Sequence, residues 1–272
     1  YPLAPPETYD QLRDIAMFFT RPDEGLYGLA IYTQADYDAL TMGVENVFFS
    51  FGAEWQDENN NVMGVVNSPE AVAGVEFYRS LYECCQAPGL SNAFFAEVND
   101  AFIGGKVAMG MNYFAFFPAL VNPEVNPHAA DTGFFVNPAG PGGAQHAALG
   151  GQGTSIISYI SPERQEASKA FLRWFAQESI QEEWARLGGY TCNINVLQSE
   201  EFLNATPYNA AFAETMTFVK DFWNIPVFGD LLLVAQTELG KYIVSGEGTA
   251  QEAMDNIATQ HDTILRDAGV IE

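Results

Sequence analysis

The sequence predicts an α/β protein with open, mostly parallel sheets, and two observations lead to this fold class. Segments with helical spacing of apolar residues alternate with short, almost entirely apolar segments at residues 26–32 and 107–111, the pattern of strands buried in a parallel sheet. Two Ser-Pro-Glu sequences, at residues 68–70 and 161–163, provide a capping serine and a first-turn proline, which are helix start signals. Alternating helices and buried strands define the α/β class.

The expected elements can be placed in order along the chain. Thr8 can cap a first helix over residues 8–19, because Leu12, Ile15 and Phe19 share one face. The Pro/Gly-rich residues 137–143 are expected to form a loop. Further helices are expected at residues 35–51, 92–103, 199–222 and 231–244, from Ser68, from Ser161 through Phe175, and from Thr249, where Glu252 completes a capping box. We also expect a glycine turn at 150–153 that leads into a buried strand ending at Tyr159, and a loop at 190–197.

Composition and charge exclude several classes of function. The chain has 272 residues, of which 48% are apolar, enough for a large core, and length alone permits one large domain or two smaller ones. Its 35 acidic and 11 basic residues give a formal charge of −24. Nucleic acids and anionic lipids bind Lys/Arg clusters, so neither is an expected partner. No run of 18 apolar residues predicts a membrane span, and no signal peptide pattern opens the chain.

No catalytic, cofactor or metal motif stands out in the sequence. The three histidines lie outside metal-ligand spacings, and the glycine motifs of nucleophile elbows and phosphate loops are missing. Cys84, Cys85 and Cys192 are too few for a disulfide framework. The adjacent pair is interpreted as structural, and a bridge to Cys192 remains open. The acidic residues are spread over helices, and no spacing selects the carboxylate pair of a glycosidase.

The most informative stretch is residues 100–117, where a short buried strand is followed by Tyr113 and Phe114. An aromatic ring just past a strand can stack on the apolar face of a sugar, although ordinary core packing is the alternative. The turn at 150–153 lacks a following Lys or Arg and precedes a strand. It therefore suits backbone approach to an uncharged ligand better than a phosphate site, and a plain tight turn is the alternative.

Four blocks, taken in order, carry a resemblance to a known family. They are residues 27–77, 102–111, 149–175 and 225–254, which include the Ile-Gly-Gly-Lys-Val-Ala-Met-Gly-Met and Leu-Gly-Gly-Gln-Gly sequences. Together they resemble extracellular solute-binding proteins of ABC importers, of the sugar-binding type that includes the maltose-binding protein. The resemblance covers nearly the whole chain and corresponds to roughly the C-terminal two-thirds of that family's proteins.

The resemblance implies a type II periplasmic-binding-protein-like fold of two lobes, each a helix-flanked open sheet, with a ligand cleft between them. Residues 1–147 and 199–272 would build the C-terminal lobe, and residues 148–198 the returning segment of the N-terminal lobe. The family's opening β-α-β-α segment has no counterpart here, so we expect the first lobe to be incomplete.

The resemblance also implies a function. The chain would capture a neutral carbohydrate and deliver it to the membrane permease, in the periplasm or outside the cell, without a cofactor, a metal or an enzymatic step. A polyamine or amino-sugar binding protein and, less favoured, a carbohydrate-active enzyme are the alternatives. Trp223 is expected to pack rather than to contact the ligand. The residues that match ligand-binding positions of the family are Tyr37, Asp38, Trp55, Tyr113, Phe114, Gly151, Gln152, Tyr190 and Phe228.

Overall fold

A computed structural model describes residues 4–151 and 153–272. The chain divides into two compact units. Unit 1 comprises residues up to 132, 137–149 and 218–272, and unit 2 comprises residues 133–136 and 150–217. Unit 2 thus takes in residues 199–217, which the sequence analysis placed with the C-terminal lobe. The correspondence of the two units to the two lobes stays a prediction.

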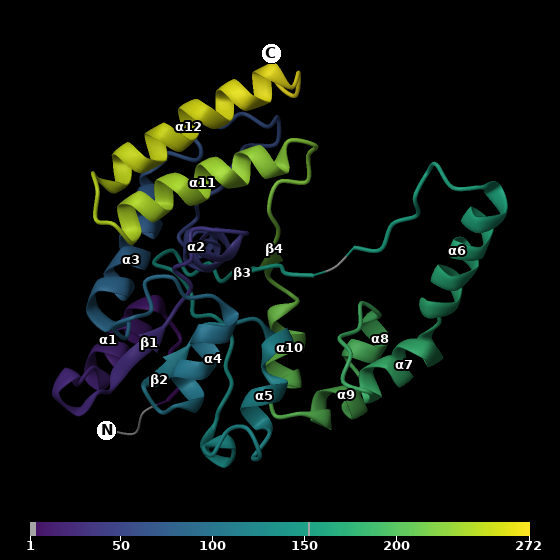
Figure 1. Ribbon diagram of the computed structural model, residues 1–272, viewed down its shortest axis with the longest axis horizontal. Coiled ribbons are helices and arrows are strands. Elements are labelled where there is room, and N and C mark those ends of the chain that lie inside the picture. The colour runs from purple at the N-terminus through teal and green to yellow at the C-terminus, as the bar shows by residue number, and fades with distance from the viewer. Residues whose placement is uncertain (1–3, 152) are drawn as a thin grey trace. The chain divides into compact units, whose positions relative to one another are not determined.

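Unit 1 contains most of the regular structure (Figure 1). Its α-helices are α1 (Tyr9–Phe19), α2 (Ala39–Ser50), α3 (Pro69–Cys85), α4 (Phe95–Ile103), α5 (Pro118–Val121), α11 (Phe228–Ile243) and α12 (Ala250–Asp267). Its 3₁₀ helices are η1 (Pro22–Glu24), η2 (Phe114–Phe116) and η3 (Ala129–Asp131). Its strands are β1 (Tyr27–Ala30), β2 (Val107–Gly110), β3 (Ala147–Ala148) and β4 (Val219–Lys220).

The helix starts expected from the sequence are confirmed by capping contacts. The Thr8 hydroxyl accepts a hydrogen bond from the Gln11 amide at 3.2 Å, and Ser68 caps α3 in the same way. Thr249 and Glu252 form the expected capping box of α12, in which each side chain accepts from the other residue's backbone amide. These contacts satisfy amide groups that have no partner inside the helix.

The strands pair in parallel, as expected, but in two small sheets. In one, β1 pairs with β2, and in the other, β3 pairs with β4. Helix α1 packs on β1, and the approach is so close that a Cβ on Gly28 would lie 1.8 Å from the Ala16 carbonyl oxygen. Only glycine fits there. The carboxyl ends of β1 and β2 lie at the same edge, which places the residues after both strands together.

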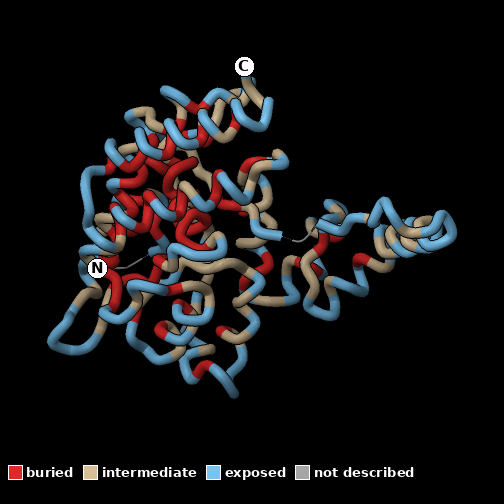
Figure 2. The backbone as a smooth tube through the Cα atoms, turned by 45° about the horizontal axis from the view of Figure 1, so that its top comes forward, coloured by how far each residue is buried: buried red, intermediate tan, exposed pale blue. Residues whose placement is uncertain are grey.

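The core of unit 1 lies among helices α2, α3, α11 and α12. Helices α11 and α12 run side by side, α2 packs on α3 and α11, and α3 contacts α12 (Figure 1). Figure 2 shows buried residues concentrated in these helices. Helix α2 is buried at every position except Asn46, which is half-buried. This sequestered helix therefore passes through the interior, and its polar side chains need partners there.

The cysteine pairing corrects one possibility left open by the sequence. Cys84 and Cys85, at the end of α3, form a disulfide with each other. Cys192 is a free, exposed thiol. A long-range bridge to Cys192 is therefore wrong, and the interpretation of the adjacent pair as structural fits its place at the buried end of a helix.

Unit 2 is built from short helices with few buried residues (Figure 2). They are α6 (Pro162–Phe175), α7 (Glu178–Arg186), α8 (Ile194–Leu197), α9 (Glu200–Ala205) and α10 (Asn209–Thr215). Ser161 caps α6 as expected. The expected loop at residues 190–197 is wrong in part because its end forms α8, whose first amides are capped by the Asn193 side chain at 2.9 and 3.2 Å.

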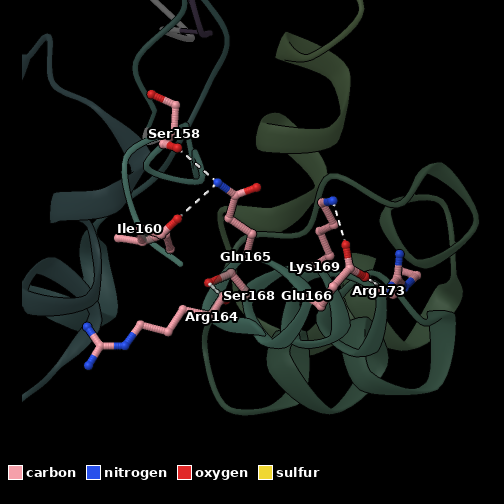
Figure 3. Close-up of polar contacts among 8 residues, drawn as sticks. All are labelled: Ser158, Ile160, Arg164, Gln165, Glu166, Ser168, Lys169 and Arg173. Carbon is pink, nitrogen blue, oxygen red and sulfur yellow. Dashed lines mark hydrogen bonds and ion pairs between the residues drawn. The ribbon is translucent and has the colours of Figure 1, made fainter. Parts of the chain in front are cut away.

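The buried strand expected before Tyr159 is wrong. Among the described residues of this segment there is no strand, and Tyr159 is 89% exposed. The Gln165 side chain instead donates to the carbonyl oxygens of Ser158 and Ile160 at 2.9 and 3.3 Å (Figure 3). Within α6, Glu166 forms ion pairs with Lys169 and Arg173 at 2.7 and 3.9 Å. The segment before Tyr159 therefore forms no strand, and the Gln165 side chain holds the turn that leads into α6.

Candidate ligand-binding site

A row of aromatic rings crosses the edge where β1 and β2 end. Tyr32 follows β1 and Tyr113 follows β2, and their rings stack with centroids 6.2 Å apart. Phe94 meets Tyr32 edge-on at 4.9 Å and lies 6.3 Å from Tyr37. We call Tyr37, Phe94, Tyr32 and Tyr113 the aromatic row. Its position at the carboxyl ends of parallel strands is where ligands bind in open α/β sheets.

A network of amide groups holds Tyr32 and Tyr113 in this arrangement. The Asn112 side-chain oxygen accepts hydrogen bonds from the Tyr32 hydroxyl and, at 2.8 Å, from the Tyr113 amide. The Asn112 amide nitrogen donates in turn to Asn99 Oδ1 at 2.8 Å and to the Phe95 carbonyl oxygen at 3.0 Å. Asn112 therefore fixes the geometry of both rings.

Tyr37 is presented to solvent by an unusual backbone conformation. Its φ is 60°, in the left-handed region that non-glycine residues rarely adopt. The Asp36 carboxylate accepts from the Tyr37 amide at 2.7 Å, and the Gln236 side chain donates to the Tyr37 carbonyl at 2.6 Å. The ring is 70% exposed. A strained residue braced on both sides while its ring stays open to water is typical of a binding position.

One face of α2 carries a polar cluster beside the aromatic row. Asp38, Thr41 and Glu45 are spaced three and four residues apart, so they share a helix face. Thr41 and Glu45 are fully buried. The structure provides no hydrogen-bond partner among the described residues for Asp38 Oδ1, Thr41 Oγ1 or Glu45 Oε2. We call these three residues the polar cluster.

Two tryptophans connect the polar cluster to the start of α11. The Trp55 indole N–H donates to Glu45 Oε1 at 2.6 Å, and its ring stacks on Phe48 and lies 4.7 Å from Trp223. Trp223 lies 6.2 Å from Phe228, the first residue of α11. The Trp223 indole nitrogen is buried and finds no partner within the described part of the chain. Trp223 thus packs, as expected, yet leaves one donor unused.

Burial and like charges dominate the electrostatics of this region. Burial raises the pKa of Glu45 well above its usual range, and the negative charges of Asp221 and Asp38 raise it further against the opposing Trp55 hydrogen bond. Burial also raises the pKa of Asp38. The pKa of Tyr113 is raised well above its ordinary value, first by burial and then by Glu45, Tyr32, Asp38 and Asp221. These groups therefore act on one another electrostatically, and the negative charges of Asp38 and Asp221 influence both Glu45 and Tyr113.

The charge of this region is uncompensated. None of the ion pairs formed by the described residues includes Asp38, Glu45 or Asp221. Lys220, next to Asp221, pairs with Glu54 instead. An anionic ligand would meet only repulsion here, because phosphate and carboxylate groups need Arg or Lys donors.

The unused polar atoms define what the region can bind. Acceptors are available on Asp38 and Gln236, hydroxyl groups on Thr41 and Tyr113, and an unpaired carboxyl oxygen on Glu45. Buried polar groups without partners are rare in proteins, and a cluster of them near the exposed Tyr37 indicates a place for an external partner. Hydroxyl groups, which both donate and accept, match this mixed set.

The structure brings some predicted site residues together and separates others. Tyr37, Asp38 and Tyr113 belong to one region of unit 1, and Phe228 joins it through Trp223. Trp55 is only 3% exposed and lies in the core behind Glu45. Phe114 starts η2, where its half-buried ring meets Phe117 at 4.9 Å.

Three predicted site residues, Gly151, Gln152 and Tyr190, belong to unit 2 of the chain. Gly151 is exposed, and a Cβ added to it would meet nothing within 4 Å. Tyr190 is half-buried, with its ring 4.6 Å from Phe212 and its carbonyl accepting from Trp184 Nε1 at 3.1 Å. Gln152 lies outside the described residues.

Sequence reasoning missed several members of the region. No sequence motif pointed to four of these residues, which are Tyr32, Phe94, Glu45 and Gln236. One signal was available: Asp38, Thr41 and Glu45 recur at helical spacing within an otherwise apolar segment. Polar residues on a helix that is apolar all round indicate either a buried network or a site.

No group of three or more His, Cys, Asp or Glu side chains among the described residues has the arrangement of a metal site. Within the same residues, no helix has both the length and the apolar character needed to cross a membrane.

The parallel strands, the flanking helices and the match to solved structures define a type II periplasmic-binding-protein-like fold. The model of the bacterial extracellular solute-binding protein family matches residues 2–211. The chain therefore belongs to the bacterial extracellular solute-binding protein family.

Similar proteins agree with this assignment. A probable ABC transporter-binding protein from Deinococcus radiodurans is 24% identical over 79% of this chain and 51% of its own length. The periplasmic-binding protein YcjN of an ABC transporter from Escherichia coli is 25% identical over 94% of this chain and 57% of its own length. The chain thus spans about half the length of these two relatives.

Solved structures show the same fold. Maltose-bound MalE3 from T. maritima superposes with a TM-score of 0.84 at 25% identity, covering 97% of this chain and 67% of MalE3. A ribitol-bound solute-binding protein from Agrobacterium radiobacter gives a TM-score of 0.82 at 20% identity, covering 96% and 65%.

Proposed function

We propose that this chain is the substrate-binding component of an ABC importer and that it captures a neutral carbohydrate in a cleft between two lobes, outside the cytoplasm. Delivery of the sugar to membrane permease subunits completes the proposed role. The similar structures were solved with maltose and with ribitol, both polyhydroxylated and uncharged. Closure of two lobes on a ligand would give the permease a state to recognise.

The observation that carries this proposal is the exposed ring of Tyr37 beside buried, unpaired polar atoms. Sugars have apolar C–H faces that stack on aromatic rings and hydroxyl edges that need hydrogen-bond partners. The aromatic row offers the stacking surface, and Asp38, Thr41 and Tyr113 offer the hydrogen-bond partners. Gly151, Gln152 and Tyr190 remain proposed ligand-binding residues on the strength of the family resemblance alone.

One observation favours a second candidate ligand class. Asp38, Glu45 and Asp221 act on one another without a described cationic partner. An ammonium group has three donors and no acceptor, and it interacts favourably with aromatic faces. A polyamine or an amino sugar would therefore also fit, and we retain it as the alternative.

Thermal unfolding of the full chain with a ligand panel tests the proposal. The panel contains maltose, maltotetraose, D-mannitol and ribitol as neutral probes, with spermidine and glucosamine as cationic probes. A bound ligand at about 100 times its Kd stabilises the folded state by about 2.7 kcal/mol. Stabilisation by a neutral probe that is recovered unchanged supports the proposal. Stabilisation by the cationic probes alone supports the alternative, and cleavage products would indicate an enzyme.

A further inference from the structure

Glu45 occupies a position where a carboxylate is difficult to keep charged. It is completely buried, with no ion pair to a described residue, and the negative charges of Asp221 and Asp38 act on it. An ionised carboxylate in such surroundings is strongly disfavoured unless it is paired. Each partner group is known: Asp38 on the same helix face, Asp221 after β4, Tyr113 after β2 and the Trp55 indole. Glu45 is therefore held as the neutral acid.

The location of the proton follows from the hydrogen bonds. Glu45 Oε1 accepts from the Trp55 indole N–H at 2.6 Å. That oxygen is occupied as an acceptor, so the proton belongs on Oε2. Oε2 is buried and has no partner among the described residues. The protonated Oε2 is consequently a donor without an acceptor. Asp38 Oδ1 and the Tyr113 hydroxyl are buried without partners among the described residues as well, and Glu45 and Asp38 both influence Tyr113 electrostatically.

We propose that Glu45, as a neutral acid, is a specificity-determining residue that donates a hydrogen bond from Oε2 to an oxygen atom of the bound ligand. The inference rests on the proposed function, because it concerns the same region of unit 1. It adds a residue that the family resemblance did not supply. A buried donor left unpaired in the free protein strongly prefers ligands that offer an acceptor at that point.

The proposal makes ligand binding dependent on pH in a definite direction. Only the protonated form donates, so binding retains the proton and ionisation of Glu45 opposes binding. Affinity should be constant below the pKa of Glu45 in the free protein and should fall by at most about tenfold per pH unit above it. Buried glutamic acids titrate as high as about pH 8–9, so the useful range runs from about pH 5 to pH 9.

Substitutions of Glu45 separate this role from a structural one. Glu45→Gln keeps an N–H donor at the Oε2 position and a carbonyl at Oε1, so we expect it to bind within a few-fold of the wild type and to lose the alkaline decrease. Glu45→Leu keeps the volume but removes the donor, so the Kd should rise on the order of tenfold to a hundredfold. Circular dichroism establishes that each variant is folded.

Glu238→Gln is the matched control. Glu238 is also a buried helical glutamate, but both of its oxygens have partners, Lys241 Nζ at 2.6 Å and Asn256 Nδ2 at 3.0 Å. Its substitution should change neither the affinity nor the pH profile. An infrared band of a protonated carboxylic acid that is present in the wild type and absent in Glu45→Gln provides a readout that needs no ligand.

Titration calorimetry of the full chain with maltose, maltotetraose, D-mannitol and ribitol from about pH 5 to pH 9 tests the proposal. An affinity that falls with rising pH in the wild type but not in Glu45→Gln supports it. Wild-type affinity in Glu45→Leu, an affinity that rises with pH, or a missing acid band overturns it while leaving carbohydrate binding intact. Failure of all four probes to bind overturns the proposed function itself and removes the role assigned to Glu45.

Discussion

The rings of Tyr32 and Tyr113 stack with centroids 6.2 Å apart and an interplanar angle of 27°, although 80 residues separate the two in sequence. Parallel pairing of β1 with β2 produces this contact, because each tyrosine follows the end of its strand. The pair provides the rigid support on which the more exposed members of the aromatic row depend.

Tyr37→Ala should weaken sugar binding without weakening the fold. The ring is exposed, so the free energy of unfolding should change by less than about 0.5 kcal/mol. Loss of a stacking surface should raise the Kd for a neutral sugar by about tenfold. Calorimetric titration and thermal unfolding measure the two effects. Phe18→Ala, which removes an exposed ring from α1, should leave both unchanged, and an equal loss of affinity in both variants would contradict a role for Tyr37.

Tyr113 separates the contribution of a hydroxyl from that of a ring. Its hydroxyl is buried and has no partner among the described residues. Tyr113→Phe should therefore leave the free protein as stable as before, or up to about 1 kcal/mol more stable, while weakening sugar binding. Tyr113→Ala should abolish binding in a folded protein, as the family resemblance implies.

Tyr9→Phe is the control for Tyr113→Phe. Tyr9 is also a buried tyrosine and belongs to the core, but its hydroxyl has a partner because it donates to the Asn46 carbonyl at 3.0 Å. Its removal should destabilise the protein by about 1 kcal/mol and leave binding unchanged. Equal stability losses for the two variants in urea unfolding would show that the Tyr113 hydroxyl is paired in solution.

His261 should make stability fall in mild acid. Burial lowers the pKa of His261 to about 4, against a weaker opposing effect of the Leu231 carbonyl. Between about pH 6.5 and pH 4 the unfolded chain binds a proton that the folded chain does not, so folding stability rises with pH in this window. As pH falls through it, about 1.4 kcal/mol is lost per unit, roughly 3 kcal/mol in all.

His261→Gln isolates this contribution from that of the many carboxylates. Glutamine can donate to the Leu231 carbonyl but does not titrate. We therefore expect the difference in unfolding free energy between wild type and variant to shrink as pH falls from about 6.5 to 4. A difference that stays constant across the window would contradict a neutral, buried His261.

Trp55→Phe should destabilise the core by about 2–4 kcal/mol. It removes indole volume from a buried position and leaves Glu45 Oε1 without its N–H donor. Trp184→Phe, at a tryptophan that is 43% exposed in unit 2, should lose less than about 1 kcal/mol. Chemical denaturation followed by circular dichroism compares the two, and similar losses would contradict the buried role of Trp55.

Local signals predicted much of the fold. The helix caps could be predicted because donor and acceptor lie only three residues apart, so both are visible in a short stretch of sequence. These caps are Thr8, Ser68, Ser161 and Thr249. The strand expected before Tyr159 failed because an apolar run indicates burial only if another layer covers it, and periodicity carries no information about that layer. The helix expected from residue 35 begins at Ala39, because Tyr37 adopts a left-handed conformation.

The candidate site was predictable only where it follows strand ends. Tyr113 could be placed because it directly follows an apolar strand, and Tyr37 entered through family resemblance. Glu45 and Gln236 lie on helices that the sequence indicates as core, and their unpaired atoms exist only after tertiary packing. Unsatisfied hydrogen-bond capacity depends on three-dimensional neighbours and is not visible in residue spacing.

We infer that the region around Tyr37, Tyr113 and the polar cluster binds a carbohydrate. Titration calorimetry of the full chain with maltose, maltotetraose, D-mannitol and ribitol, run in parallel on Tyr37→Ala and Phe18→Ala, tests it most directly. We expect saturable binding of at least one probe by the wild type and by Phe18→Ala, with an affinity about tenfold lower in Tyr37→Ala. Binding that is equally tight in all three proteins, or no binding to any of the four probes, would contradict it.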